Sequence, residues 1–169
     1  MTIADSLVQE LEMEAATTRK VLARIPSDKL AWKPAEKSRT LGQLGYHIAV
    51  NPGSVAGLAA QNPARLPDFG QPEPSASSTA DLLSALDESV AQAKTLLGAM
   101  NDQTLLDTWR LTAGEQEILA MPRIAFLRSI MLNHWYHHRG QLSVYLRELN
   151  VPVPSIYGPS ADENPFMRG

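Results

Sequence analysis

Apolar residues recur every three or four positions in four separate stretches of this 169-residue chain, and proline or glycine lies between the stretches. This spacing places apolar side chains on one face of an α-helix, so each stretch predicts an amphipathic helix. The length suits one domain of about 100–200 residues. We therefore expect an all-α fold, a four-helix bundle, in a single domain that spans residues 1–169. The expected helices cover residues 3–24, 40–60, 78–97 and 122–150.

The connections between these helices differ in length and composition. Pro52 lies inside the second helix, where it removes a backbone donor and predicts a kink or a break. Residues 61–77 are rich in proline, glycine and serine, and they predict a long crossover loop between helices two and three. Residues 101–120 are ambiguous, with a short extended piece at 108–111. We expect the C-terminal tail, residues 155–169, to pack on the bundle.

The composition excludes several classes of chemistry. The chain has no cysteine, which excludes disulfides, cysteine-ligated zinc, iron–sulfur clusters and a cysteine nucleophile. The net charge of −3 offers no basic field for nucleic acid or an anionic membrane. No apolar run approaches the length of about 18 residues that a membrane span needs. The N-terminus lacks the features of a signal peptide, so we expect a cytoplasmic protein.

Three of the four histidines are predicted to point into the bundle. At 100° per residue, with His134 set at zero, the apolar residues of the last helix fall at about +20° to +80°. His138 falls at about +40°, within this face, whereas His137 falls at about −60°, away from it. The same construction places His47 on the apolar face of the second helix. The inward set is therefore His47, His134 and His138.

These three side chains could bind one metal ion. The spacing of His134 and His138 places their Cβ atoms about 6 Å apart on one face, and His47 would come from another helix. Three imidazoles leave coordination positions open, which is typical of a catalytic site. A di-iron carboxylate site needs two Glu-x-x-His pairs, and no glutamate stands three residues before a histidine here. The alternative is a set of hydrogen-bonded core histidines without metal.

Other residues are weaker candidates near these histidines. Gln141 lies one turn beyond His138 and could hydrogen-bond to it. Tyr145 could line a pocket, and Arg139 could attract an anionic substrate. Asp162 and Glu163 could supply a carboxylate if the tail folds over the bundle.

Three segments together resemble the DinB superfamily. The first is TLGQLGYHIA at residues 40–49, and the second is NHWYHHRGQL at residues 133–142, which is similar to the family's H-x-x-x-H-R-G-Q motif. The third is VPVP at residues 151–154, followed by YGPSADE at residues 157–163. The resemblance implies a bundle with a long crossover, which in this family is often dimeric. It also implies a divalent metal on His47, His134 and His138, since the second motif histidine directly precedes Arg-Gly.

The resemblance implies a metal-dependent enzyme that acts on a small molecule. Characterised relatives include S-transferases that use a low-molecular-weight thiol, and we expect zinc or nickel as the metal, although imidazole suits several metals. The metal could activate an external thiol, or a metal-bound water could make the protein a hydrolase. A metal-binding, stress-related protein without turnover is a further alternative. We expect a homodimer that binds neither nucleic acid nor membrane.

Overall fold

Four long helices build the core of the protein, and the computed structural model describes residues 1–167 of the chain. The last long helix runs without a break through α5, a π-helical segment at Leu127–Asn133, and α6. The α-helices are α1 (Ile3–Leu22), α2 (Leu41–Ala59), α3 (Thr79–Gly98), the short α4 (Asp102–Leu106), α5 (Arg123–Phe126) and α6 (His134–Glu148). The expected four-helix architecture is therefore present, with ends that differ by a few residues.

The helix starts follow ordinary capping rules. Thr40 accepts a hydrogen bond from the Gln43 backbone N–H, and the Gln43 side chain accepts one from the Thr40 N–H. This reciprocal pair satisfies two backbone donors that would otherwise lack partners at the start of α2. The Ser78 hydroxyl caps α3 by accepting a single hydrogen bond from the Asp81 N–H. The N-cap of α2 matters for the site, because it fixes where His47 lies about two turns later.

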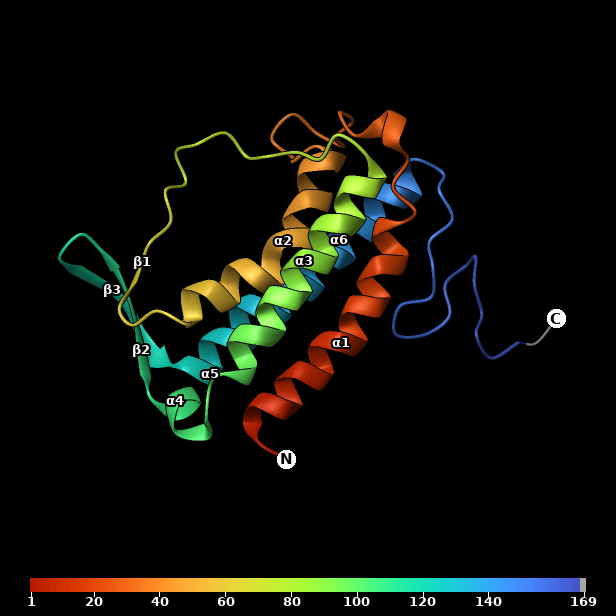
Figure 1. The fold of residues 1–169 in the computed structure, drawn as a ribbon. Coiled ribbons are helices and arrows are strands. Elements are labelled where there is room, and N and C mark those ends of the chain that lie inside the picture. The colour runs from red at the N-terminus through yellow and green to blue at the C-terminus, as the bar shows by residue number, and fades with distance from the viewer. Residues whose placement is uncertain (168–169) are drawn as a thin grey trace.

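Helices α2 and α3 run side by side in the same direction, which Figure 1 shows from their colour gradients. A parallel pair needs a long connection, and residues 60–78 supply it. The two helices approach closely at Gly53, whose N–H donates to the Ser89 hydroxyl at 2.8 Å. A Cβ atom at Gly53 would lie 2.9 Å from the Ser89 carbonyl oxygen, so only glycine permits this approach.

Helix α2 continues through Pro52 and bends midway, as Figure 1 shows. Pro52 has no N–H to donate to the Ile48 carbonyl one turn earlier. The buried Trp135 indole N–H donates to that carbonyl instead, at 2.8 Å. The proline therefore does not break the helix, because a side chain of the last helix replaces the missing backbone donor.

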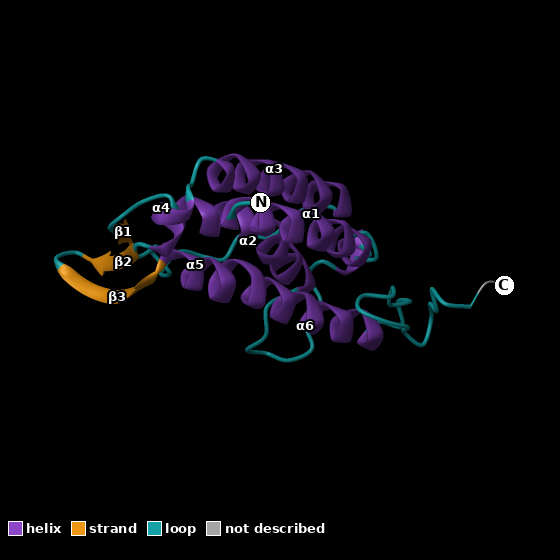
Figure 2. Ribbon diagram, turned by 90° about the horizontal axis from the view of Figure 1, so that it is seen from below, coloured by secondary structure: helices purple, strands orange, loops and turns teal. Residues whose placement is uncertain are grey.

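A small sheet lies at one end of the bundle, so the expectation of a strictly all-α protein was wrong (Figure 2). The strands are β1 (Ala64–Arg65), β2 (Thr108–Ala113) and β3 (Gln116–Pro122), with β2 in the centre, β1 parallel to it and β3 antiparallel. Gly114 makes the hairpin turn at φ 61°. The hairpin is stable here because Trp109 of β2 is buried and stacks on Phe126 at 3.9 Å between ring centroids.

The crossover loop is fastened to this sheet. The Asn62 side chain donates to the Thr108 carbonyl at 2.9 Å and accepts from the Arg110 N–H at 3.0 Å. The loop then continues past β1 toward the start of α3. The crossover and the hairpin therefore form one unit beside α2.

The tail is held against α1 and α6. Asp162 pairs with Arg147 at 2.6 Å, and Glu163 pairs with Arg24 at 2.5 Å. Asp162 also accepts from the Val153 N–H at 2.9 Å. Within residues 1–167, no helix is both long and apolar enough to cross a membrane.

Candidate metal centre

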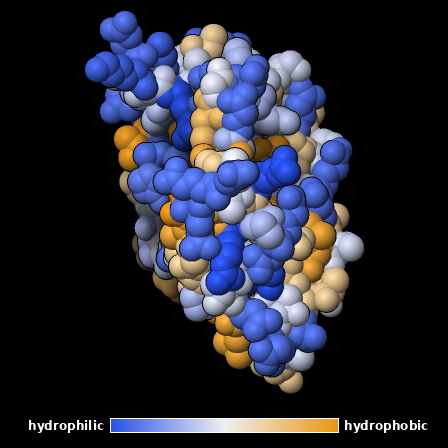
Figure 3. Space-filling view, turned by 90° about the vertical axis from the view of Figure 1, so that its left-hand side faces the viewer, coloured by the Kyte–Doolittle hydropathy of each residue, from blue (hydrophilic) through white to orange (hydrophobic). Residues whose placement is uncertain are grey.

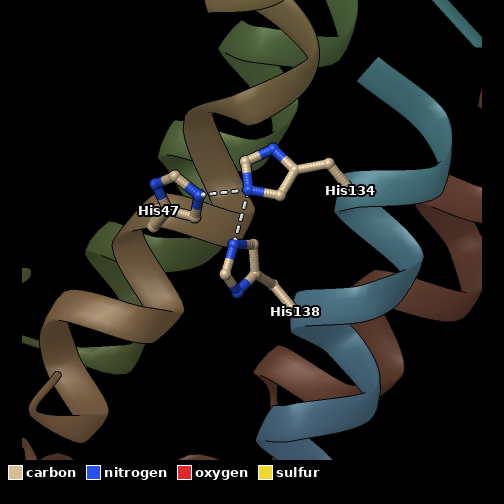
Figure 4. A group of neighbouring side chains, drawn as sticks. All are labelled: His47, His134 and His138. Atoms are coloured by element: carbon tan, nitrogen blue, oxygen red, sulfur yellow. Dashed lines mark hydrogen bonds between the residues drawn. The ribbon is translucent and has the colours of Figure 1, made fainter. Parts of the chain in front are cut away.

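Three imidazole rings meet between α2 and α6, and Figure 4 shows them pointing toward one another. His47 comes from α2, and His134 and His138 come from the first turns of α6. The Nε2 atom of His134 lies 3.5 Å from Nε2 of His47 and 2.6 Å from Nε2 of His138. The structure therefore brings together the three histidines that the sequence singled out, and it leaves His137 exposed.

The π-helical segment ends immediately before the first of these histidines. Within this segment the carbonyl of Met131 accepts a hydrogen bond from the Asn51 side chain of α2, at 2.8 Å. From His134 onward the helix has ordinary α-helical turns, so His134 and His138 share one face. Short π-helical segments inside α-helices are frequent at functional sites. Asn51, which the sequence reasoning missed, thus fastens α2 to the segment that presents His134.

The environment keeps the three imidazoles neutral. Burial is the main cause that lowers the pKa of His47 to about 4, and the positive charge of Arg39 contributes. Burial also lowers the pKa of His138 to about 4, although its hydrogen bond to Gln141 acts in the opposite direction. The pKa of His134 is lowered as well, mainly by burial. Neutral imidazoles are the form that binds metals.

Gln141 determines the tautomer of His138. Its side-chain oxygen lies 2.7 Å from Nδ1 of His138, so Nδ1 carries the proton and donates it. The lone pair of His138 then lies on Nε2, which faces the other two rings. A hydrogen-bonded partner of this kind orients a ligand imidazole and raises its basicity. The structure thus places Gln141 where the sequence predicted, one turn beyond His138.

His134 lacks a corresponding partner. Among the described residues its buried Nδ1 atom makes no hydrogen bond. The Ile130 carbonyl, one turn earlier, raises the pKa of His134, but burial has the larger effect and lowers it. The contact of Nδ1 with this carbonyl does not have the geometry of a hydrogen bond. A buried nitrogen without a partner is rare and costs free energy. The polar contacts of this ring are made by its Nε2 atom, which lies within hydrogen-bond distance of both other rings (Figure 4).

The spacing of the nitrogens fits a shared metal ion. Two imidazole nitrogens bound at about 2.0–2.1 Å, with ordinary angles between them, lie about 2.9–3.4 Å apart. The observed separations of 2.6 and 3.5 Å lie on either side of this range, and all three ligand atoms fall within 4.8 Å of one another. His47, His134 and His138 would hold the ion, and their rings leave other coordination positions free.

A polar cavity of about 420 Å³ opens beside His138. Its walls include Arg39, which precedes α2, and Glu73, from the crossover loop, and these two side chains form an ion pair at 2.5 Å. The Arg39 hydrogen bond is the main cause that lowers the pKa of Glu73. Sequence reasoning missed both residues, because they lie 34 positions apart in loops that have no periodic pattern.

Tyr145 also lines this cavity. Its hydroxyl donates to the Arg39 carbonyl at 3.3 Å, and its ring packs edge-on against Trp32 with centroids 5.6 Å apart. Tyr145 therefore holds the segment that carries Arg39, which agrees with a pocket-lining position.

Three other candidates lie away from the histidines. Arg139 points to the opposite side of α6 and pairs with Glu14 of α1 at 2.6 Å. Asp162 and Glu163 are engaged by Arg147 and Arg24 in the tail contacts described above. The structure therefore does not bring these three side chains to the site, and the nearby carboxylate is that of Glu73.

Comparisons with known proteins agree with this architecture. The model of the DinB family matches residues 1–165. The uncharacterized protein YrdA of Bacillus subtilis (strain 168) is 30% identical over 162 residues, which cover 94% of this chain and 90% of that protein. A DinB-like protein from Bacillus cereus ATCC 10987 has a similar structure, with a TM-score of 0.69 and 24% identity, over 92% of this chain and 98% of that chain.

A second solved structure shares the fold. YfiT from Bacillus subtilis, described as a probable metal-dependent hydrolase with an unusual four-helix bundle topology, has a TM-score of 0.65 and 17% identity. The match covers 88% of this chain and 89% of YfiT. At this identity the likeness establishes the bundle and its connections.

Proposed function

The chain belongs to the DinB family, and from this membership together with the geometry of its histidines we propose that it is a metal-dependent enzyme acting on a small molecule. The observation that carries the proposal is the convergence of three Nε2 atoms, one from α2 and two from α6, beside open cavities. A structural zinc site has four protein ligands, whereas three ligands are typical of catalytic sites.

The chain's own residues have separate tasks in this proposal. His47, His134 and His138 hold a divalent ion, and Gln141 keeps the proton of His138 on Nδ1 so that Nε2 faces the ion. When bound, such an ion acts as a Lewis acid and lowers the pKa of a coordinated water or thiol. Arg39 and Glu73 present one charge of each sign to a polar group in the cavity beside His138.

Hydrolysis is the first candidate reaction. It is supported by the description of YfiT as a probable metal-dependent hydrolase, since both chains have the same bundle. The test is a screen of small esters, amides and phosphoesters with the protein loaded with zinc or nickel. Turnover that follows metal content and disappears in His138→Ala supports hydrolysis, whereas metal binding without any turnover favours the non-catalytic alternative.

Thiol transfer is the second candidate, and the polar cavity favours it. The chain contains no thiol of its own, so a thiol substrate must come from outside. Arg39 and Glu73 could pair with the carboxylate and amino groups of a low-molecular-weight thiol beside His138. The same screen, repeated with cysteine-containing thiols and an electrophilic acceptor, separates the two reactions. Transfer that is lost in Arg39→Ala, with metal content unchanged, supports this candidate.

The metal itself is tested by mass spectrometry of untagged protein. We expect about one zinc or nickel ion per chain, lost in His47→Ala and retained in His137→Ala, because His137 is exposed and lies outside the group. No metal in any sample, even after reconstitution, would overturn the proposal. A homodimer remains a prediction from the family resemblance, and light scattering of the purified protein tests it.

A further inference from the structure

A second cavity, of about 340 Å³, lies against the other side of the histidine group. His47 and His134 form one end of it. Its walls come from the second half of α2, from the crossover loop, from the hairpin and from the helix that leads to α6. Residues of α2 on both sides of Pro52 line this space, as does Ile130 of the π-helical segment, so both departures from regular helix geometry lie close to the cavity.

The lining of this cavity is almost entirely apolar. Val55 and Leu58 of α2, Leu111 of β2 and Leu119 of β3 contribute its walls. The polar residues in its lining are His47, Asn51, Ser54 and His134, and the amide nitrogen of Asn51 donates one hydrogen bond to the Met131 carbonyl. The two imidazoles are the metal-binding groups of a cavity whose other walls are mostly hydrocarbon. This contrasts with the polar cavity beside His138, which is lined by Arg39 and Glu73.

Large apolar side chains lie exposed around the opening of the cavity. Phe69 of the crossover loop is 79% exposed, and Leu66 and Ile130 are each 39% exposed. Figure 3, which views the molecule from its hairpin side, shows hydrophobic patches between hydrophilic ones on this surface. Apolar groups that cluster at the rim of a cavity are typical of a ligand-binding site.

We propose that this cavity binds an alkyl or aryl group of the substrate while the reacting head of the same molecule lies at His47 and His134. This inference rests on the proposed function and extends that function by naming a substrate class, amphipathic small molecules. The volume lies in the range of about 300–1,000 Å³ that small-molecule sites occupy, which is too small for a protein segment with its own fold. The cavity ends at the metal-binding group, so an apolar tail seated in it would direct its head there.

The first experiment uses a series of straight-chain hydroxamic acids, whose head group binds metals and whose tail grows by one methylene at a time. Calorimetry with the zinc-loaded protein should show affinity rising about three- to fourfold per methylene until the cavity is filled. Equal affinity along the whole series would overturn the proposal, because the tails would then remain in water.

Two variants assign the effect to this cavity. Ser54 lines it from an exposed position on α2, so Ser54→Phe fills the space without disturbing the core. This variant should lose the dependence on chain length while it keeps the affinity for acetohydroxamic acid. Ser84→Phe, at an exposed position of α3, is the matched control and should behave like the native protein. Retention of the chain-length dependence in Ser54→Phe would contradict the assignment.

A metal-free measurement separates this inference from the proposed function. Toluene carries no metal-binding head, and saturation-transfer NMR should detect its binding to chelator-treated native protein and to Ser84→Phe, but not to Ser54→Phe. Toluene binding in a protein that never takes up metal would overturn the proposed function and the position of the head group, while it supports the apolar site. Metal binding without toluene binding would overturn the apolar site alone.

Discussion

Two polar clusters lie on opposite faces of α6, and they differ in whether their partners are all present. One face carries His134 and His138, which meet His47 of α2. The other carries Tyr136 and Arg139, which meet α1 and the tail. Both clusters take polar groups out of water, so burial alone does not distinguish a site from a structural contact.

The Arg139 cluster is complete as it stands. The Arg139 side chain is 1% exposed, and its guanidinium pairs with Glu14 at 2.6 Å and donates to the Thr18 hydroxyl at 3.1 Å. It also lies over the rings of Tyr136 and Tyr157, at 5.3 and 5.0 Å from their centroids. A buried charge with an opposite charge, hydrogen bonds and aromatic faces around it needs no further ligand.

The histidine cluster, by contrast, does not supply a partner for each of its polar atoms. Its three Nε2 atoms converge on one another without a carboxylate between them, and Nδ1 of His134 has no partner among the described residues. Two cavities open beside it. The contrast teaches that convergent imidazole nitrogens beside open cavities indicate a functional site, whereas a fully partnered buried charge indicates a structural one.

The strongest way to test this contrast is to remove the structural charge. Arg139→Ala leaves Glu14, whose side chain is 14% exposed, without its opposite charge and with only the hydrogen bond from the Tyr157 hydroxyl. We expect a loss of about 3–5 kcal/mol in the free energy of unfolding, because the ion pair is broken and the buried space of the Arg139 side chain is left unfilled. Denaturant titration measures the loss, and the metal content of the folded fraction should stay the same as in the native protein.

Arg128→Ala is the matched control. Arg128 pairs with Glu10 of α1, but its side chain is 47% exposed, so its removal should change stability by no more than about 0.5 kcal/mol. If Arg139→Ala lost no more free energy of unfolding than this control, the Arg139 guanidinium would not be what stabilises the contact of α6 with α1. If it removed the metal from folded protein, the two clusters would not be independent.

A second test concerns the support of the helix that carries His47. Trp135→Phe removes the indole N–H that satisfies the Ile48 carbonyl, the group that Pro52 leaves without a backbone donor. We expect a loss of about 1–3 kcal/mol in the free energy of unfolding, the usual cost of an unsatisfied buried polar group. Thermal and denaturant unfolding measure it.

The control for this effect is the double variant Trp135→Phe with Pro52→Ala. Alanine at position 52 restores an N–H that can donate to Ile48, so the tryptophan substitution should cost less in this background than in the native one. Equal costs in both backgrounds would show that the indole acts through packing and not through this hydrogen bond.

The sequence allowed the histidine group to be predicted because the relevant residues obey helical geometry. His134 and His138 stand at the start of α6, after the π-helical turns end, so a constant step of 100° holds between them. The same step does not describe Leu127–Asn133, where the turns are wider. The prediction succeeded there only because the deviation ends before His134.

The sheet and the polar cavity could not be predicted in the same way. The hairpin depends on the burial of Trp109 against Phe126, a tertiary contact that a local pattern does not reveal. Arg39 and Glu73 come from two loops, and loop residues meet through the path of the chain and not through periodicity. Arg139 was misjudged for a related reason, since its partners Glu14 and Tyr157 lie far away in sequence.

A smaller effect should follow when the residue that supports a metal ligand is replaced and the ligand itself is kept. Gln141→Leu removes the acceptor that keeps the proton of His138 on Nδ1. We expect metal affinity to fall about 10- to 100-fold, the usual consequence of removing such a partner. Competition with a chelator of known affinity measures it. Gln141→Glu retains an acceptor oxygen and should restore most of the affinity, and an unchanged affinity in Gln141→Leu would show that the tautomer is set elsewhere.

The smallest expected effect is a near absence of pH dependence in metal binding. Protons compete with a metal for imidazole only when the pH approaches the pKa of the free ligand. Burial lowers the pKa of His47 and of His138 to about 4, so these two rings stay neutral as the pH falls from 7 to 5.5, and burial also lowers the pKa of His134. Metal affinity measured by chelator competition should therefore change far less over this interval than it would at a site of exposed histidines. Three exposed histidines with ordinary pKa values near 6.5 would lose roughly several hundredfold in affinity over the same interval. A decrease of that size would mean that the three imidazoles are exposed to water in solution. It would contradict the burial that distinguishes this cluster from three surface histidines.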